Sequence, residues 1–296
     1  MSALVKRIVL SLHRRGFLDC LTDKMYLKLM FRVKMDRKLD LKTPKTYNEK
    51  LQWLKLYDRK PEYSTMVDKY EAKKYIAEQV GEEYIIPTIG VWEKFDDIDF
   101  DALPDQFVLK CTHDSGGLVI CQDKSKLDLA AVRAKIERCL TTDYYLRGRE
   151  WPYKNVKPRI IAEKFIEDGD NQYLMDYKFF CFNGNPKCLY ICRMQPGDAT
   201  DYLEFLSLDW KRLPFTRGGH IRFEKLPPKP VNYEKMLEFS KKLSEGLPSL
   251  RVDFYEVGGK LYIGELTFFT GSGYIEFDPP EWDEKIGQWL ELPPKK

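Results

Sequence analysis

Several features that would assign the chain to a class of protein at once are missing from its sequence. No apolar run approaches the roughly 20 residues that a membrane-spanning helix requires. The formal net charge is only +3 over 296 residues, with acids and bases interspersed, so charge gives no argument for nucleic-acid binding. There is no glycine-rich strand–turn–helix of the dinucleotide-binding kind and no internal repeat. The 43% hydrophobic and 32% charged residues are typical of a globular protein of one to three compact units.

Paired cysteine motifs are also missing. The seven cysteines are an odd number, spread along the chain and often flanked by apolar residues. We therefore predict reduced thiols and a cytoplasmic protein rather than a disulfide framework. Cys181, Cys188 and Cys192 are close in sequence, but they lack the spacing of a zinc site and occur in strand-like runs, so we do not predict zinc.

The N-terminal segment, residues 3–15, interleaves apolar and basic residues at roughly helical spacing. Its apolar core is too short for a signal peptide, and no small-residue cleavage site follows it. A helix packed against its own domain is the first interpretation. The second is a basic helix in peripheral contact with an anionic membrane surface, at the inner face of the membrane.

Hydrophobic periodicity predicts mostly helices up to about residue 60 and a mixture of helices and strands beyond it. The aromatic, polar segment 144–153 is interpreted either as a loop over a cleft, where Arg147, Arg149 and Lys154 could meet an anionic substrate, or as a solvated loop. The main elements are expected as helices at 46–57, 68–81, 129–140 and 233–245, and as strands at 84–92, 107–121, 159–168 and 174–193, the last with a turn at Asn183-Gly184.

Residues 251–273 are expected to form two strands joined by a two-residue turn at Gly258-Gly259. Side chains alternate along a strand, so the two antiparallel strands can place Asp253 and Glu265 side by side. Like charges directly opposed on a sheet are unfavourable, so the pair favours a cation between them. Hard oxygen ligands suit Mg²⁺. The alternative is an edge hairpin with solvated acids.

Residues 107–121 form a second informative stretch, with the pattern strand, loop, strand. Lys110 ends an apolar strand beside a glycine turn at 115–117, whose backbone N–H groups could approach a phosphate. An ordinary hairpin is the alternative. His113 and Asp114 precede a serine, but consecutive residues cannot form the convergent chain of a hydrolase triad.

An acidic loop offers a different metal-binding pattern. Asp97, Asp99 and Asp101 have the Asp-x-Asp spacing that a nucleotide-sugar glycosyltransferase uses to hold a metal. Short acidic loops at turns are common, so a solvated loop is the favoured interpretation.

The order of these elements resembles that of the ATP-grasp enzymes, and most closely the TupA-like ATP-grasp family linked to teichuronopeptide and cell-surface polysaccharide synthesis. The resemblance runs from about Lys42 to Gly273 and rests on an ordered set: Asp68-Lys69, the strand ending in Lys110, the glycine loop, Glu163 to Ile166, Asp176 with Lys178, then Arg-x-Asp and Glu-x-Thr. It implies an α+β fold in which two α+β subdomains clasp ATP between antiparallel sheets. We predict a helical N-terminal region at 1–60, a central subdomain at 61–165 and a C-terminal subdomain at 166–296.

The resemblance also implies a nucleotide site. Lys69 and Lys110 match basic positions near the phosphates, and Ser115, Gly116 and Gly117 match a mobile loop that closes over them. The linker that contacts the adenine edge corresponds to Glu163, Lys164, Phe165 and Ile166, and the acid that holds the ribose corresponds to Asp170. Lys178 is expected to be a second phosphate contact.

For the metal and the chemistry, the resemblance implies Asp253 and Glu265 as Mg²⁺ carboxylates and Arg251 as the arginine near the transferring phosphate and acyl group. The third metal ligand of the family is usually asparagine, whereas Thr267 stands at that position here. A hydroxyl is a weaker ligand than an amide oxygen, which puts a second metal ion in doubt. Short helices also replace the usual N-terminal nucleotide-fold domain.

The function implied is that of an ATP-dependent carboxylate–amine ligase that forms an amide through an acyl phosphate. Its expected substrates are a small-molecule or glycan carboxylate, such as a uronic acid of a surface polysaccharide or its precursor, and an amine or amino acid. No nucleic acid is expected as a partner. Two alternatives stay open, a glycosyltransferase of polysaccharide biosynthesis that uses the acidic loop and a catalytically degenerate nucleotide-binding protein.

Overall fold

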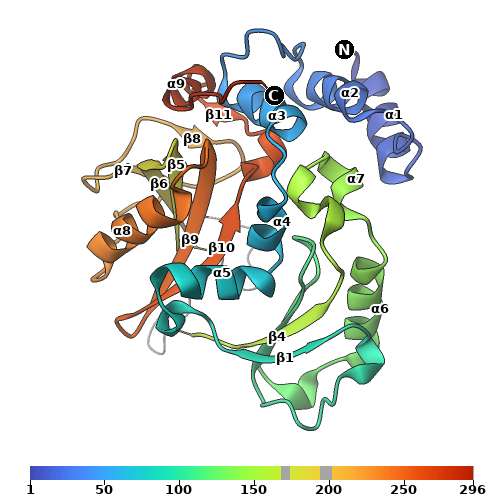
Figure 1. Ribbon diagram of the computed structural model, residues 1–296, viewed down its shortest axis with the longest axis vertical. Helices are drawn as coiled ribbons and strands as arrows, with labels where there is room; N and C mark the ends of the chain where they lie inside the picture. The colour runs from blue at the N-terminus through green and yellow to red at the C-terminus, as the bar shows by residue number, and fades with distance from the viewer. Residues whose placement is uncertain (168–173, 194–201, 296) are drawn as a thin grey trace.

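The computed structural model describes residues 1–167, 174–193 and 202–295, which fold around two antiparallel sheets (Figure 1). The smaller sheet has the order β1-β4-β2-β3 and consists of β1 (Thr88–Trp92), β2 (Phe107–Cys111), β3 (Leu118–Cys121) and β4 (Ile160–Lys164). The larger has the order β10-β9-β5-β6-β7 and consists of β5 (Met175–Phe182), β6 (Asn185–Arg193), β7 (Tyr202–Ser207), β9 (Ser249–Val257) and β10 (Lys260–Thr267). The predicted α+β class with antiparallel sheets is confirmed.

Helices cover the two sheets and form the N-terminal region. The N-terminal ones are α1 (Ala3–Arg14), α2 (Asp23–Met35), α3 (Tyr47–Tyr57), α4 (Glu62–Val67) and α5 (Glu71–Val80). Later come α6 (Leu129–Leu140), α7 (Tyr144–Gly148), α8 (Tyr233–Ser244) and α9 (Trp282–Trp289), with a two-stranded ribbon of β8 (Thr216–Arg217) and β11 (Phe277–Asp278). Short 3₁₀ turns occupy 82–84, 95–97, 124–126, 151–155 and 270–273. None of the helices in the described residues is both long enough and apolar enough to cross a membrane.

Local sequence explains where several elements begin and turn. At the start of α3, the Thr46 hydroxyl accepts a hydrogen bond from the Glu49 amide, and the Glu49 carboxylate accepts one from the Thr46 amide at 3.1 Å, which is a capping box. Gly258 and Gly259 join β9 to β10 with φ of 55° and 75°, a conformation that glycine adopts without strain. Both predicted two-residue turns, this one and that at Asn183-Gly184, are confirmed.

Two predicted elements were wrong in part. The strand expected over 84–92 begins only at Thr88: residues 82–84 form a 3₁₀ turn, and Ile85 makes an isolated parallel bridge with Ile263 of β10. The segment 144–153 is helical rather than a loop, and Arg149 is buried, with its guanidinium 2.9 Å from the Asp19 carbonyl oxygen and 3.7 Å from the Asp23 carboxylate. Arg149 therefore anchors this segment to the N-terminal helices and is not exposed to a substrate.

The apolar core is divided between the two sheets. Buried side chains of β2, β4 and α6 form one cluster, and a larger one joins β5, β6, β7, β9 and β10 to α3, α4, α5, α8 and α9. A third, small cluster lies around α2. Helices α4 and α5 thus pack with the larger sheet, while Lys73 in the first turn of α5 pairs with Glu163 of the smaller one. The subdomain limits at 60/61 and 165/166 stay a prediction. The space that the two cores leave between the sheets contains the candidate site.

Candidate active site

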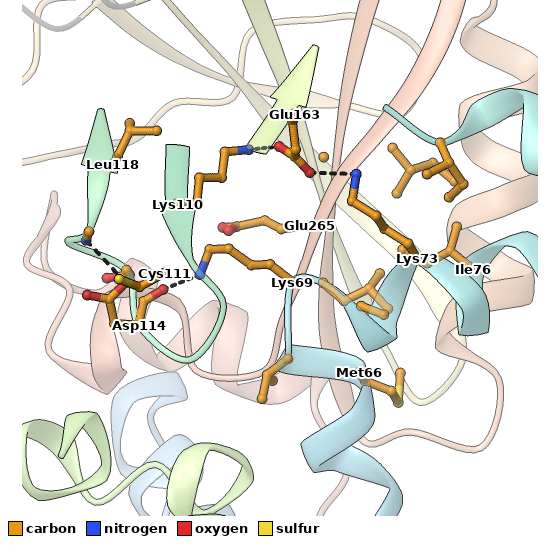
Figure 2. Close-up of a pocket in the computed structure, with 18 of the residues that line it drawn as sticks. Met66, Lys69, Lys73, Ile76, Lys110, Cys111, Asp114, Leu118, Glu163 and Glu265 are labelled. Carbon is orange, nitrogen blue, oxygen red and sulfur yellow. Dashed lines mark hydrogen bonds and ion pairs between the residues drawn. The ribbon is translucent and has the colours of Figure 1, made fainter. Parts of the chain in front are cut away.

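A cavity of about 250 Å³ lies between the two sheets and α4–α5 (Figure 2). Strands β2 and β4 form one wall, and β5, β9 and β10 form the other. Four lysines from different elements line it: Lys69, Lys73, Lys110 and Lys178. Apolar side chains that include Met66, Ile76, Leu118 and Leu266 cover the rest of the wall, together with the acids Asp114, Glu163 and Glu265.

Glu163 holds two of these lysines in place. Its carboxylate lies 2.5 Å from the ammonium group of Lys110 and 2.6 Å from that of Lys73 (Figure 2). Burial opposes ionisation of Glu163, but the two lysines outweigh it and hold the pKa of this carboxyl below its ordinary value. The pairing of β2 with β4 brings Lys110 and Glu163 together. Val108 is the cross-strand partner of Glu163, and Lys110 lies two residues further along β2, on the same face of the sheet.

Lys69 enters the cavity from the connection between α4 and α5. Its backbone N–H donates to the Thr112 carbonyl at 3.0 Å, and its ammonium group donates to the Asp114 carbonyl. Burial lowers the pKa of Lys69, because desolvation disfavours the charged form. The preceding residue, Asp68, accepts from the Tyr70 amide and pairs with Arg159 at 2.6 Å, so the connection is fixed at both sides.

The glycine loop closes one end of the cavity. The Asp114 carboxylate accepts from the Gly117 amide at 3.1 Å, and the Ser115 and Tyr144 hydroxyl groups lie 2.9 Å apart. A Cβ at Gly117 would lie 2.9 Å from the Cys111 sulfur, so this position requires glycine. A Cβ at Gly116 would make only an ordinary contact, 3.9 Å from Asp114 Oδ2, and Gly116 does not line the cavity.

The β9–β10 hairpin brings the two predicted metal carboxylates together. Glu265 is the direct cross-strand partner of Asp253, because a bulge at Gly264 shifts the register by one residue after the pair of Ile263 and Phe254. Their surroundings nevertheless differ sharply. The Glu265 side chain is 45% exposed and extends into the cavity between Lys69 and Lys110 (Figure 2). Asp253 is completely buried and does not line the cavity.

Two cations surround Asp253. Arg251 donates to both carboxylate oxygens at 2.6 Å, and Lys178 donates to Oδ2 at 2.5 Å. Burial opposes ionisation of Asp253, but Arg251 and Lys178 outweigh it and lower its pKa. Lys178 also lies 2.6 Å from the Asp176 carboxylate. Burial raises the pKa of Asp176 to about 6, although Lys178 acts in the opposite direction.

The carboxylate oxygens of Glu265 and Asp253 form a donor set that fits Mg²⁺. Glu265 Oε1 accepts from Arg251 at 3.0 Å and from the Thr267 hydroxyl at 3.1 Å, while Oε2 makes no hydrogen bond to the described part of the chain. Asp253 Oδ1 accepts one bond, and a carboxylate oxygen can accept two. A hard cation prefers such all-oxygen ligands. The sharing of Asp253 with Arg251 and Lys178 was not predictable from the hairpin alone.

The structure brings together seven of the residues predicted for the site. Those that line the cavity are Lys69, Lys110, Ser115, Gly117, Glu163, Lys178 and Glu265. Asp253, Arg251 and Thr267 adjoin Glu265 without lining the cavity. Lys164 and Phe165 line a separate depression beside Pro87, Ile166 follows them outside β4, and Asp170 lies outside the described residues.

Sequence reasoning missed Lys73 and Tyr153, which both line the cavity. A signal for Lys73 was present, because it lies four residues after Lys69 and so about one helical turn further along. No local pattern marked Tyr153. The acidic loop forms its own turn, in which Asp99 accepts from the amides of Asp101 and Ala102, and it does not line the central cavity.

Two antiparallel sheets that enclose a lysine-rich cavity define the ATP-grasp class of fold. The model of one family of this class, the TupA-like ATP-grasp proteins, matches residues 49–291. The chain belongs to the TupA-like ATP-grasp family. A comparison with proteins of curated function found no match.

Solved structures with similar folds include D-alanine–D-alanine ligases and a D-cycloserine synthetase. The ligase from Helicobacter pylori is 17% identical, with a TM-score of 0.45 over 83% of this chain and 69% of that one. The ligase from Bacillus anthracis complexed with ATP is also 17% identical, with a TM-score of 0.38 over 69% of this chain. The synthetase is 15% identical, with a TM-score of 0.41 over 76% of this chain and 69% of that one. The match spans only 54% of the Bacillus anthracis enzyme.

Proposed function

We propose that the protein is an ATP-dependent carboxylate–amine ligase. Its carboxylate substrate is a uronic acid of a cell-surface polysaccharide or of a precursor, and its amine substrate is an amino acid or another amine. Membership of the TupA-like family supports the choice of polysaccharide. Seven free cysteines, five of them buried, support a cytoplasmic location.

One observation carries the proposal, namely the convergence of four lysines and Glu265 on a single cavity between two sheets. A triphosphate is the common anion that requires several cations and a metal-binding carboxylate at once. The apolar wall formed by residues such as Ile76 and Leu266 suits the flat face of a nucleobase. The site therefore has separate surfaces for the base, the phosphates and a metal.

In the proposed reaction, Lys69 and Lys110 hold the phosphates of ATP while the loop at Ser115–Gly117 excludes water from the cavity. Glu265 and Asp253 would hold Mg²⁺, which supplies charge neutralisation on the phosphoryl oxygens when it is bound. Lys73 and Glu163 keep Lys110 directed into the cavity by the ion pairs described above.

The chemistry has two steps. An oxygen of the substrate carboxylate attacks the γ-phosphorus, the bond to the β–γ bridging oxygen breaks, and ADP leaves. The amine then attacks the acyl carbon of the acyl phosphate, the amide forms, and inorganic phosphate leaves after the nitrogen loses a proton. Arg251 does not line the cavity, but its guanidinium group reaches Glu265 at 3.0 Å, and we propose that it supplies positive charge to the oxyanion of the second step from that side. The chain need not supply a nucleophile.

The proposal is tested by a thermal-shift and ADP-release screen with Mg-ATP against uronic acids paired with amino acids. ADP should form only when a carboxylate and an amine are both present, and Mg-ATP alone should raise the melting temperature. No ADP from any pair, together with no shift by Mg-ATP, would refute the ligase and the nucleotide site together. A shift without turnover would support instead the degenerate nucleotide-binding alternative. The glycosyltransferase alternative gains no support from the acidic loop, whose Asp99 is engaged in its own turn.

A further inference from the structure

Helix α1 presents an apolar face that the described part of the protein does not cover. The helix contains no buried residue and lies at the outer edge of the molecule (Figure 1). The large apolar side chains exposed on it follow one another at helical spacing, and they are Leu4, Val5, Ile8 and Leu12. Phe17, which follows the helix, is exposed as well. Five exposed large apolar side chains within 14 positions form a patch rather than isolated residues.

The opposite face of α1 attaches the helix to the protein. Val9 and Leu10 pack against the small apolar cluster formed by α2, and the His13 ring contacts Tyr26 at a centroid distance of 5.7 Å. Successive residues differ by 100° around a helix, so Val9, Leu10 and His13 lie on the side away from Leu4 and Ile8. The interpretation as a helix packed on its own domain therefore accounts for one face only.

The charges beside the free face have one sign. The first 18 residues contain no acid, and Arg7, Arg14 and Arg15 are exposed and form no ion pair with the described residues. Lys6 is different, since it lies 3.3 Å from Asp36, which also pairs with the N-terminal amine. The apolar stripe is thus bordered by arginines whose charges are free to contact an anionic surface.

We propose that α1 is an interfacial helix that binds anionic phospholipid, with Leu4, Ile8 and Leu12 in the acyl boundary and Arg7 and Arg14 at the headgroups. An apolar stripe bordered by basic residues is what such a surface recognises, because burial of apolar area and attraction to anionic headgroups add. A protein interface has no general need for unpaired arginines beside the stripe. This function is independent of the proposed ligase activity, since it involves none of the residues of the cavity.

The test is cosedimentation of the full-length protein with vesicles of phosphatidylcholine alone and of phosphatidylcholine with a third phosphatidylglycerol. Wild-type protein should bind the anionic vesicles far more strongly, and added salt should weaken the binding. Arg7→Gln/Arg14→Gln should lower the partition coefficient about thirtyfold, if each arginine contributes about 1 kcal/mol near the surface. Ile8→Ser/Leu12→Ser should lower it at least about tenfold.

A matched control keeps the comparison specific. Ile120 and Leu129 are 55% and 45% exposed, similar to Ile8 and Leu12 at 49% and 37%, but they belong to β3 and α6. Ile120→Ser/Leu129→Ser should bind anionic vesicles as the wild type does. Because all four side chains are exposed, both double variants should retain the wild-type melting temperature.

Three results would overturn the proposal. The first is that wild-type protein fails to bind anionic vesicles, and the second is equal binding to neutral and anionic vesicles. The third is that light scattering finds a dimer which Ile8→Ser/Leu12→Ser converts to a monomer, while vesicle binding is unchanged by that substitution. In that case a second copy of the chain covers the face.

Discussion

The two carboxylates assigned to Mg²⁺ should differ greatly in how much stability the protein loses when their charge is removed. Asp253 is completely buried against Arg251 and Lys178, so Asp253→Asn leaves two nearly buried cations short of an anion. Removing one partner of a buried ion pair costs about 3–5 kcal/mol, and for a chain of this size that lowers the melting temperature by about 10 °C. Glu265 is half exposed, so Glu265→Gln should cost at most about 1 kcal/mol.

Binding of ATP should separate the two variants further. We expect Mg²⁺ to strengthen ATP binding to the wild type, and we expect Glu265→Gln to lose that enhancement while it stays folded. Glu137→Gln is the matched control, because Glu137 is 49% exposed and also pairs with an arginine, but lies on α6 away from the cavity. Calorimetric titration of ATP with and without Mg²⁺, combined with thermal melts of all four proteins, gives both quantities.

The pH dependence checks the ion-pair argument on its own. The pKa of Asp253 is lowered in the folded state, so its stabilisation is complete above the unfolded value of about 4 and is lost as the pH falls below it. The stability gap between wild type and Asp253→Asn should therefore be widest near neutral pH and narrow below pH 4. Equal melting temperatures for Asp253→Asn and Glu265→Gln, or Mg²⁺ enhancement retained in Glu265→Gln, would refute the reasoning.

Three further predictions follow from the same contacts. Gly117→Ala should lower the stability by about 1–3 kcal/mol, because the added methyl group overpacks against Cys111, and it should also lower the affinity for ATP. Gly116→Ala should change neither quantity, and thermal melts and ATP titrations measure both. The pKa of Asp176 is raised to about 6, above the unfolded value of about 4, so the wild type should lose stability relative to Asp176→Asn as the pH rises from 4 to 6. Thermal melts across this pH range measure the difference, and parallel curves for the two proteins would contradict the prediction. Thr267→Asn should lower the Mg²⁺ concentration at half-maximal ATP binding severalfold, because an amide oxygen is the stronger ligand; a higher value would count against Thr267 as a ligand.

The parts of the fold that sequence could predict are those that local pattern determines. The Gly258-Gly259 turn fixes the register of β9 with β10 as far as the pair of Phe254 and Ile263. Asp253 then pairs with Glu265 because a bulge at Gly264 shifts the register by one residue, which the turn does not predict. The turn at Asn183-Gly184 is also determined locally, because positive φ is required there. Register follows from turn geometry and from the buried face, and both depend on a short stretch of sequence.

Contacts between distant segments could not be predicted in the same way. Lys178 and Asp253 are 75 positions apart, and Lys110 and Glu163 are 53 apart, so their ion pairs depend on the order of strands in each sheet. Arg149 looked solvated because its neighbours are polar, but contacts with the N-terminal helices bury it. Likewise, α1 has a local pattern that predicts a helix, while only the packing of α2 reveals which of its faces stays free.

The central claim is that a substrate carboxylate is activated as an acyl phosphate in the lysine-lined cavity. Transfer of ¹⁸O tests it most directly, with the carboxylate identified by the ADP-release screen labelled in both oxygens. The account predicts that ADP forms and that each inorganic phosphate carries one ¹⁸O atom, since the bridging oxygen leaves with the phosphate. Unlabelled phosphate, or ¹⁸O recovered in AMP, would contradict it.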